Sequence, residues 1–320
     1  MLILRADPWM PEYGMGFDVR IDEPDAAVDP YLEMQRWSGP LRPRVLGRVP
    51  AWLVDGVRRI DLRLLADADG RRVPGVFGSF AVGGARCDER ATFGEHVVGR
   101  RLVLGGGMVG AAVTVPCGSQ HLVYQPDATT STDPDGPLIR LQDLMRQTEG
   151  LLAARLAADP GVFVLADGPL TFFEATPAPV VGVVKRFGRV YLDDPESLLI
   201  PRLDVGERTP LFAIEAAARW RKRIAWYSRV APLRGTWHDH AGVARCEIRD
   251  GLGVEAAAAV ADRVSALLPD FAGRPSDPRT PQNLVPVAGL ESWLRHRLGA
   301  TALVRHALMA WITETQGVAA

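Results

Sequence analysis

The sequence is poor in lysine and cysteine and lacks long apolar runs. Only Lys185 and Lys222 are lysines, so arginine supplies nearly all of the 37 basic side chains, which face 38 acidic ones at a net charge of −1. A near-neutral chain has no global attraction for nucleic acid. Arginine nevertheless suits phosphate, because its planar guanidinium binds phosphate oxygens in pairs. Composition alone therefore neither demonstrates nor excludes a nucleic-acid groove.

The three cysteines are far apart, and none belongs to a Cys-x-x-Cys pair. This spacing predicts free thiols in a reducing compartment. No apolar run reaches the roughly 18 residues that a membrane helix needs. The first residues, MLILRADPWM, lack the basic and long apolar regions of a signal peptide. We therefore expect a soluble cytoplasmic protein that makes no membrane contact.

The chain divides into an N-terminal extension, residues 1–45, which is rich in proline and aspartate, and a domain over residues 46–320. The domain begins with strand-like segments joined by short connections, which favours antiparallel pairing. The later segments predict helices at 138–158, 210–222, 253–268 and 290–312, a buried strand at 162–166, and paired strands near 223–231 and 242–250. This order predicts an α/β fold with a mixed β-sheet flanked by helices and with C-terminal helices.

Two glycine or histidine motifs have structural explanations. GGGMVG, residues 105–110, fits the G-x-G-x-x-G pattern, but the strand-like AAVTVPC follows it where a dinucleotide fold needs a helix. We interpret it as a glycine-rich bend between strands. WHDH, residues 237–240, falls in a short connection between two strands and is interpreted as a polar hairpin loop.

Three acidic residues lie next to apolar segments of the predicted strands and helix, where a functional carboxylate could be placed. Asp55 follows the apolar triplet of WLVDG, and Asp167 ends the apolar strand before Gly-Pro. Glu149 lies on the helix along its apolar stripe, four residues after Met145 and three before Leu152. Taken singly, each has a structural alternative: Asp55 and Asp167 could be turn residues, and Glu149 could lie at the edge of the apolar stripe. A charge that faces a core is costly unless it is paired or bound to metal. Together, an aspartate in the first strand, a glutamate in the helix and an aspartate at the end of the next buried strand resemble the order of acids in ribonuclease H-like nucleases, which implies a metal site.

Four short motifs carry a family resemblance: WLVDGVRR, RQTEGLLAARLA, VLADGPLTF and VVGVVKRFG. In order and spacing they resemble the motifs of the NurA family of DNA end-processing nucleases, over residues 50–310 or so. The resemblance implies a ribonuclease H-like fold, a homodimer, DNA as substrate and a HerA-type hexameric ATPase as partner. It also implies that Asp55, Glu149 and Asp167 are metal ligands for two Mn²⁺ or Mg²⁺ ions, which carboxylate oxygens suit.

The family also has a tyrosine and a late histidine near its metals. Tyr227, in IAWYSRV, is the tyrosine candidate, and a core tyrosine is the alternative. His296 is the histidine candidate, but it also fits a helix surface, and Glu291 could take its place as a ligand.

Basic residues supply candidates for DNA contact. They are Lys185 and Arg186 in VVKRFG, and Arg221 and Arg223 in the segment RWRKRIAWYSR at 219–229. Arginines mixed with aromatic residues suit a groove that tracks a strand and stacks its bases. An exposed strand end and a solvated helix face are the alternatives for the two pairs.

The sequence thus predicts a divalent-metal-dependent deoxyribonuclease that hydrolyses phosphodiester bonds by a two-metal mechanism, in DNA repair by double-strand break end resection. If this is right, the predicted carboxylates converge on one point. The alternative is a non-catalytic ribonuclease H-like subunit that clamps DNA or docks a partner. A ribonuclease H-like enzyme that acts on RNA or hybrids is a further possibility.

Overall fold

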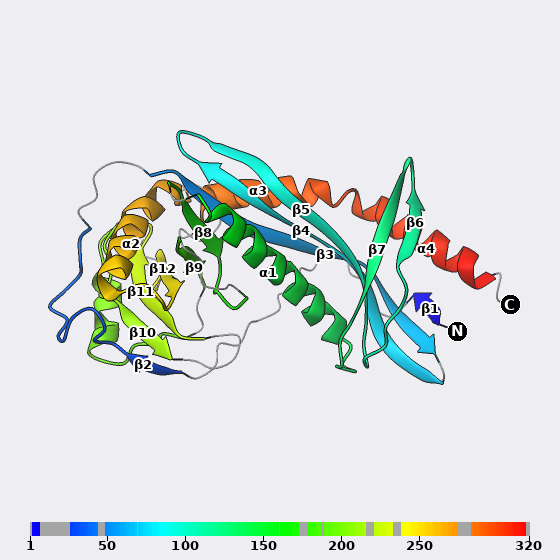
Figure 1. Ribbon diagram of the computed structural model, residues 1–320, viewed down its shortest axis with the longest axis horizontal. Helices are drawn as coiled ribbons and strands as arrows, with labels where there is room; N and C mark the ends of the chain where they lie inside the picture. Colours follow the sequence, from blue (N-terminus) through cyan, green and yellow to red (C-terminus); the bar gives the residue numbers. More distant parts are fainter. Residues whose placement is uncertain are drawn as a thin grey trace.

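The computed structural model describes residues 2–6, 26–43, 49–68, 70–159, 161–172, 178–186, 189–215, 221–232, 238–273 and 283–317 (Figure 1). The strands are β1 (Ile3–Ala6), β2 (Ala27–Asp29), β3 (Ala51–Ala68), β4 (Arg71–Cys87), β5 (Ala91–Leu104), β6 (Val113–Cys117), β7 (Gln120–Ala128), β8 (Phe163–Asp167), β9 (Val180–Val184), β10 (Phe212–Glu215), β11 (Arg223–Arg229) and β12 (Val243–Arg249). The helices are α1 (Gly136–Leu156), α2 (Val254–Leu267), α3 (Val285–Arg297) and α4 (Thr301–Gly317), with 3-10 turns at Glu196–Arg202 and Leu268–Phe271.

The centre of the sheet is built from three antiparallel strands and two parallel ones. β3, β4 and β5 follow one another through short connections and pair antiparallel, as predicted. α1 then returns the chain, so that β8 pairs parallel with β3 and β9 pairs parallel with β8. The resulting strand order at the centre is β5-β4-β3-β8-β9. The predicted mixed sheet with flanking and C-terminal helices is therefore confirmed.

Further strands extend the sheet on both sides. Beyond β9 come β12, β11, β10 and β2, and beyond β5 come β7 and β6, while β1 pairs with the far half of β3. The described parts of residues 1–45 thus add strands at two separate places in the sheet. The domain boundary at residue 45 stays a prediction.

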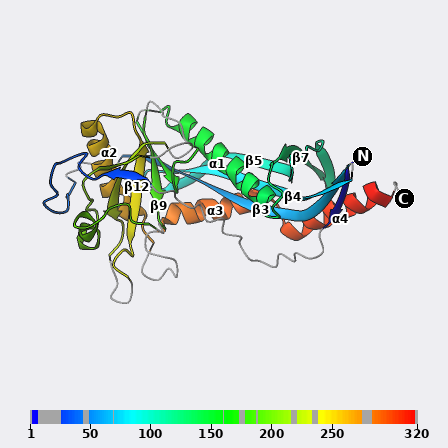
Figure 2. The same ribbon diagram turned by 90° about the horizontal axis from the view of Figure 1, so that it is seen from below.

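Helices α1 and α3 lie on opposite faces of the long strands, as Figures 1 and 2 show together. α1 buries an apolar stripe that includes Leu141, Met145 and Leu152 against one face. α3 buries Leu290 and Leu294 against the other face. Among the residues that the structure describes, none of the helices combines the length and the apolarity needed to cross a bilayer.

The helix predicted at 210–222 is wrong where the structure describes that segment. Residues 212–215 form β10, which pairs with β11 and β2, and residues 216–220 lie outside the described residues. A short apolar run does not distinguish a buried helix from a buried strand, and the pairing with β11 decides. GGGMVG forms the expected bend: it connects β5 to β6, with positive φ at Gly106 and Gly107.

Candidate metal centre

Strands β3 and β8 bring Asp55 and Asp167 side by side. In their parallel pairing Val54 lies opposite Ala166, so the next residue of each strand is an aspartate. Side chains alternate between the faces of a strand. Asp55 and Asp167 therefore share the α3 face with Leu53 and Leu165, which belong to the core cluster beneath α3. Asp167 is the last residue of β8 and is half-buried, whereas the three residues before it are buried.

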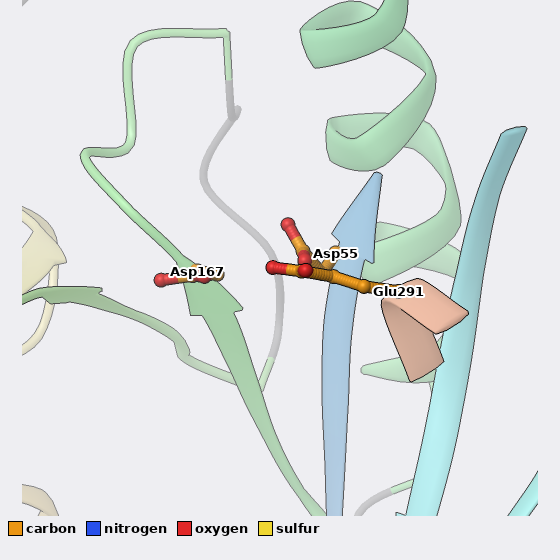
Figure 3. Close-up of side chains that lie close together, drawn as sticks. All are labelled: Asp55, Asp167 and Glu291. Carbon is orange, nitrogen blue, oxygen red and sulfur yellow. The ribbon is translucent and has the colours of Figure 1, made fainter. Parts of the chain in front are cut away.

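Glu291 of α3 completes a group of three carboxylates. One oxygen from each of Asp55, Asp167 and Glu291 lies within 4.8 Å of the other two. Figure 3 shows the three side chains coming from β3, β8 and α3. Glu291 follows the buried Leu290, at the edge of the apolar stripe, and its Oε2 accepts a hydrogen bond from Arg295 Nη2 at 2.9 Å. Residues far apart in sequence thus meet at one end of β8.

Glu149 reaches the same region from the α1 face. Its side chain is 2% exposed, and its Oε1 lies 2.6 Å from the point where a Cβ atom on Gly56 would stand. The glycine after Asp55 therefore makes room for this carboxylate. Arg146 Nη1 donates to Glu149 Oε2 at 2.8 Å, whereas Oε1 is buried without a hydrogen-bond partner among the described residues. Glu149 is not in the group of three.

Arg146 also explains the glycine after Asp167. Its Nη1 donates to the Asp167 carbonyl oxygen at 2.6 Å. Gly168 has a φ of +100°, and a Cβ atom there would lie 2.9 Å from Arg146 Nη2. A side chain at position 168 would clash with the Arg146 guanidinium, just as a side chain at position 56 would clash with the Glu149 carboxylate.

Burial and neighbouring charges raise the pKa of two of these carboxylates, Asp55 and Glu149. Burial raises the pKa of Asp55 well above its ordinary value, and the charges of Asp167 and Glu149 raise it further against the opposing effect of Lys185. Burial also raises the pKa of Glu149, which Arg146 partly offsets. Lys185 Nζ lies 2.6 Å from Asp167 Oδ2. Two cations thus pair with two of the carboxylates.

The donor set fits a hard divalent cation. Mg²⁺ and Mn²⁺ prefer carboxylate oxygens, and several anionic groups held this close are stabilised by a cation between them. Asp55, Asp167 and Glu291 could hold such an ion. Glu149 approaches from the α1 face, where its buried Oε1 has no hydrogen-bond partner among the described residues and its charge raises the pKa of Asp55. The three carboxylates on the α3 face could therefore hold a metal ion.

The structure does not bring Tyr227 or His296 to the carboxylates. Three strands, β12, β9 and β8, separate β11 from β3. Tyr227 is buried, stacks on Phe212, and accepts a hydrogen bond from the Tyr191 backbone N–H at 3.1 Å. His296 is exposed on α3, with its Nδ1 2.7 Å from the Ser292 carbonyl oxygen. Their catalytic roles stay predictions.

The four basic residues predicted to contact DNA lie in two places. Lys185 and the exposed Arg186 follow β9, next to Asp167. Arg223 is fully buried on β11, where its Nη1 lies 3.6 Å from Glu247 Oε2, and Arg221 precedes that strand with a φ of +39°. Lys185 therefore lies at the carboxylates, whereas Arg223 lies on a strand that is separated from β3 by three others.

The chain was also compared with known proteins. No family model and no curated protein matches it. Among solved structures, the NurA nuclease from Sulfolobus solfataricus is similar over 88% of this chain and 88% of that chain, with 10% identity and a TM-score of 0.45. The case for a function therefore rests on the side chains described above.

Sequence reasoning did not single out Arg146 as a site residue. Its signal was available, because an arginine three residues before an inward-facing glutamate lies on the same helix face. Glu291 was named only as a substitute for His296. Its signal was its place beside Leu290 in the apolar stripe of α3.

Proposed function

We propose that this protein is a divalent-metal-dependent DNA nuclease. The observation that carries the proposal is the meeting of Asp55, Asp167 and Glu291 within 4.8 Å of one another at the end of β8. Two of the three lie in the sequence motifs that resemble those of NurA nucleases. Phosphodiester hydrolysis is a reaction for which closely spaced carboxylates and divalent ions are commonly used.

Each acidic residue has a stated role in this proposal. Asp55, Asp167 and Glu291 bind the cation, Mn²⁺ or Mg²⁺, from the α3 face. Glu149 is a further ligand, from the α1 face. Bound ions, two in the mechanism we favour, supply activation of water and stabilisation of the leaving oxygen. Arg146 orients Glu149 and the end of β8 through its two hydrogen bonds.

Lys185 and Arg186 bind the DNA backbone in this proposal. Lys185 already lies beside a carboxylate, so its ammonium is placed to contact a phosphate that enters the site. Arg186 is exposed one residue further on, at the end of β9. Positive side chains at these two positions would hold the phosphodiester against the carboxylates.

The biological setting rests on the motif resemblance alone. On that basis we propose a homodimer that works with a HerA-type hexameric ATPase in end resection. Size measurement in solution tests the dimer, and copurification with such an ATPase tests the partner.

Digestion of end-labelled DNA in Mn²⁺ tests the nuclease activity. Asp167→Asn and Glu291→Gln remove ligand charge with little change of shape, so each should lower the cleavage rate by more than the ~10–100-fold typical of outer-shell changes. Asp88→Asn is the matched control, because Asp88 is an exposed carboxylate that pairs with Arg86 at 3.7 Å and accepts a hydrogen bond from the Arg90 backbone N–H at 3.4 Å. Equal rates for all four proteins would remove the carboxylates from the mechanism. RNA and hybrid substrates in the same assay test the nucleic-acid preference.

One observation favours the non-catalytic alternative. Lys185 and Arg146 each pair with a carboxylate of the site, so two acidic charges are already balanced without metal. A DNA-clamp subunit would bind end-labelled DNA without cleaving it, and Asp167→Asn would bind as well as the wild type. That result would select the clamp.

A further inference from the structure

The end of α3 is held by two arginines that come from the sheet. Arg59 of β3 donates from Nη2 to the Leu298 carbonyl oxygen at 3.0 Å and from Nη1 to the Gly299 carbonyl oxygen at 2.6 Å. Arg100 of β5 donates from Nη2 to the same Leu298 oxygen at 3.1 Å. The last carbonyl groups of a helix have no partners inside the helix and carry its negative dipole end. Guanidinium groups therefore suit this end in both hydrogen bonding and charge.

A buried aspartate holds the two arginines in place. Asp61 accepts a hydrogen bond from Arg59 Nε at 2.7 Å and from the Tyr124 hydroxyl at 2.8 Å. The hydroxyl of Ser79 also donates to Asp61, and Arg100 Nη1 donates to Ser79 Oγ at 2.6 Å. Four strands, β3, β4, β5 and β7, thus contribute to one network. All five side chains of this network are buried or half-buried.

A β-bulge places Asp61 in this network. The pairing of β3 with β4 passes from Ile60 opposite Gly78 to Leu62 opposite Phe77, which leaves Asp61 as the extra residue. Bulges redirect side chains and are frequent next to active sites. Asp61 has no role in the proposed chemistry, and the bulge has no explanation in the motif pattern.

The helix that this network holds carries Glu291. Leu298 lies seven residues after Glu291, which is two helical turns along nearly the same side of the helix. The buried leucines of α3 fix its distance from the sheet, but apolar contact has no direction and allows sliding. Directional hydrogen bonds from two guanidinium groups fix the position along the helix axis.

We propose that Arg59 and Arg100 are positioning residues that set the place of Glu291 opposite Asp55 and Asp167. Strand β3 then supplies both a ligand, Asp55, and the anchor for a second ligand's helix. This inference rests on the proposed metal site, but it concerns ligand placement and not cleavage.

Calorimetric titration with Mn²⁺ alone, in the absence of DNA, tests it. Arg59→Lys keeps a positive charge but loses the planar guanidinium, whose Nε, Nη1 and Nη2 atoms reach Asp61, Gly299 and Leu298 at the same time. Arg100→Met removes one donor to Leu298. Each should raise the Mn²⁺ dissociation constant about tenfold, the size of effect known for outer-shell residues. Arg101→Met is the control, because Arg101 donates to the Arg100 carbonyl oxygen and bonds none of the described residues of α3. It should leave the constant unchanged.

The same substitutions in a Glu291→Gln background separate positioning from general stability. If the arginines act through Glu291, neither change weakens Mn²⁺ binding by more than about twofold once that carboxylate is gone. An equal loss in both backgrounds would overturn the proposal, as would no loss in the wild-type background.

Hydrogen exchange of the metal-free protein gives a second measurement that does not need metal binding. Arg59→Lys should raise amide exchange in the last two turns of α3 and leave β4 unchanged. Unchanged exchange in α3 would overturn the proposal even if the wild type bound no Mn²⁺. Absence of Mn²⁺ binding by the wild type, in contrast, would count against the proposed nuclease.

Discussion

The Oε1 atom of Glu149 lies 2.6 Å from the point where a Cβ atom on Gly56 would stand, and Met145 Cγ lies 3.0 Å from it. The helix that carries Glu149 can approach β3 only because residue 56 has no side chain. The spacing between the two acidic residues of this region, Asp55 and Glu149, is thereby tied to a glycine.

Gly56→Ala should therefore displace the Glu149 carboxylate from Arg146 and destabilise the fold. Overpacking of this kind costs about 1–3 kcal/mol of unfolding free energy, measurable by urea denaturation. Gly94→Ala is the control, because a Cβ atom on Gly94 in β5 meets nothing within 4 Å. If both substitutions gave the same small change, the close approach of α1 would not be a constraint.

The stability of the metal-free protein should fall as pH rises. Burial raises the pKa of Asp55 and Glu149 in the folded state, so the folded protein binds more protons than the unfolded chain. The two groups do not lower the free energy of unfolding at a pH below their unfolded pKa of about 4. Their destabilising contribution grows as the pH rises from there through their raised folded-state pKa values. Mn²⁺ binds the deprotonated carboxylates, so its stabilising effect should grow over the same range.

Melting temperatures in EDTA and in Mn²⁺, from about pH 5 to about pH 8, measure both trends. Asp55→Asn removes one of the titrating groups and should flatten the EDTA curve relative to the wild type. A wild-type curve that rose in parallel with that of Asp55→Asn would show that Asp55 titrates normally.

Lys185→Met should strengthen Mn²⁺ binding and weaken DNA binding. The Lys185 ammonium lies 2.6 Å from Asp167 Oδ2, so its loss removes a positive charge next to the proposed ion. An increase in Mn²⁺ affinity on the order of tenfold is expected from one such charge. Lys222→Met is the matched control, since Lys222 pairs with Glu215 at 2.8 Å, away from the carboxylates. Weaker Mn²⁺ binding by Lys185→Met would contradict this electrostatic account.

Tyr227→Phe should reduce stability without changing Mn²⁺ affinity. The Tyr227 hydroxyl accepts a hydrogen bond from the buried Tyr191 N–H, and loss of this acceptor costs about 1–3 kcal/mol. Denaturation measures the first effect and calorimetry the second. A clear drop in Mn²⁺ affinity would instead give Tyr227 the role at the metals that its motif suggests.

The sequence was informative wherever the deciding contacts are local. Asp55 and Asp167 each end or follow an apolar strand segment, and parallel pairing of those strands then places them abreast. The direction of Glu149 followed from the helical stripe that contains Met145. Period and spacing determine such features, and both can be read from one segment.

Other features depend on contacts between distant segments. Glu291 joins Asp55 from a helix that begins more than 200 residues later, and its place beside Leu290 in the apolar stripe does not say which strand the helix packs against. The strand β10 was mistaken for a helix because its pairing with β2 and β11 is not encoded in its own four residues. The bulge at Asp61 likewise arises from the register with β4.

The three carboxylates rest on supports of unequal rigidity. Asp55 lies in a strand bordered on both sides, by Gly83 of β4 opposite it and by β8 alongside, whereas Asp167 is the last residue of β8 and Glu291 extends from a helix surface. Mg²⁺ holds its oxygens at about 2.0–2.1 Å and Ca²⁺ at about 2.3–2.6 Å. When a larger ion replaces a smaller one, Asp167 and Glu291 would therefore move to fit it, while Asp55 keeps its position.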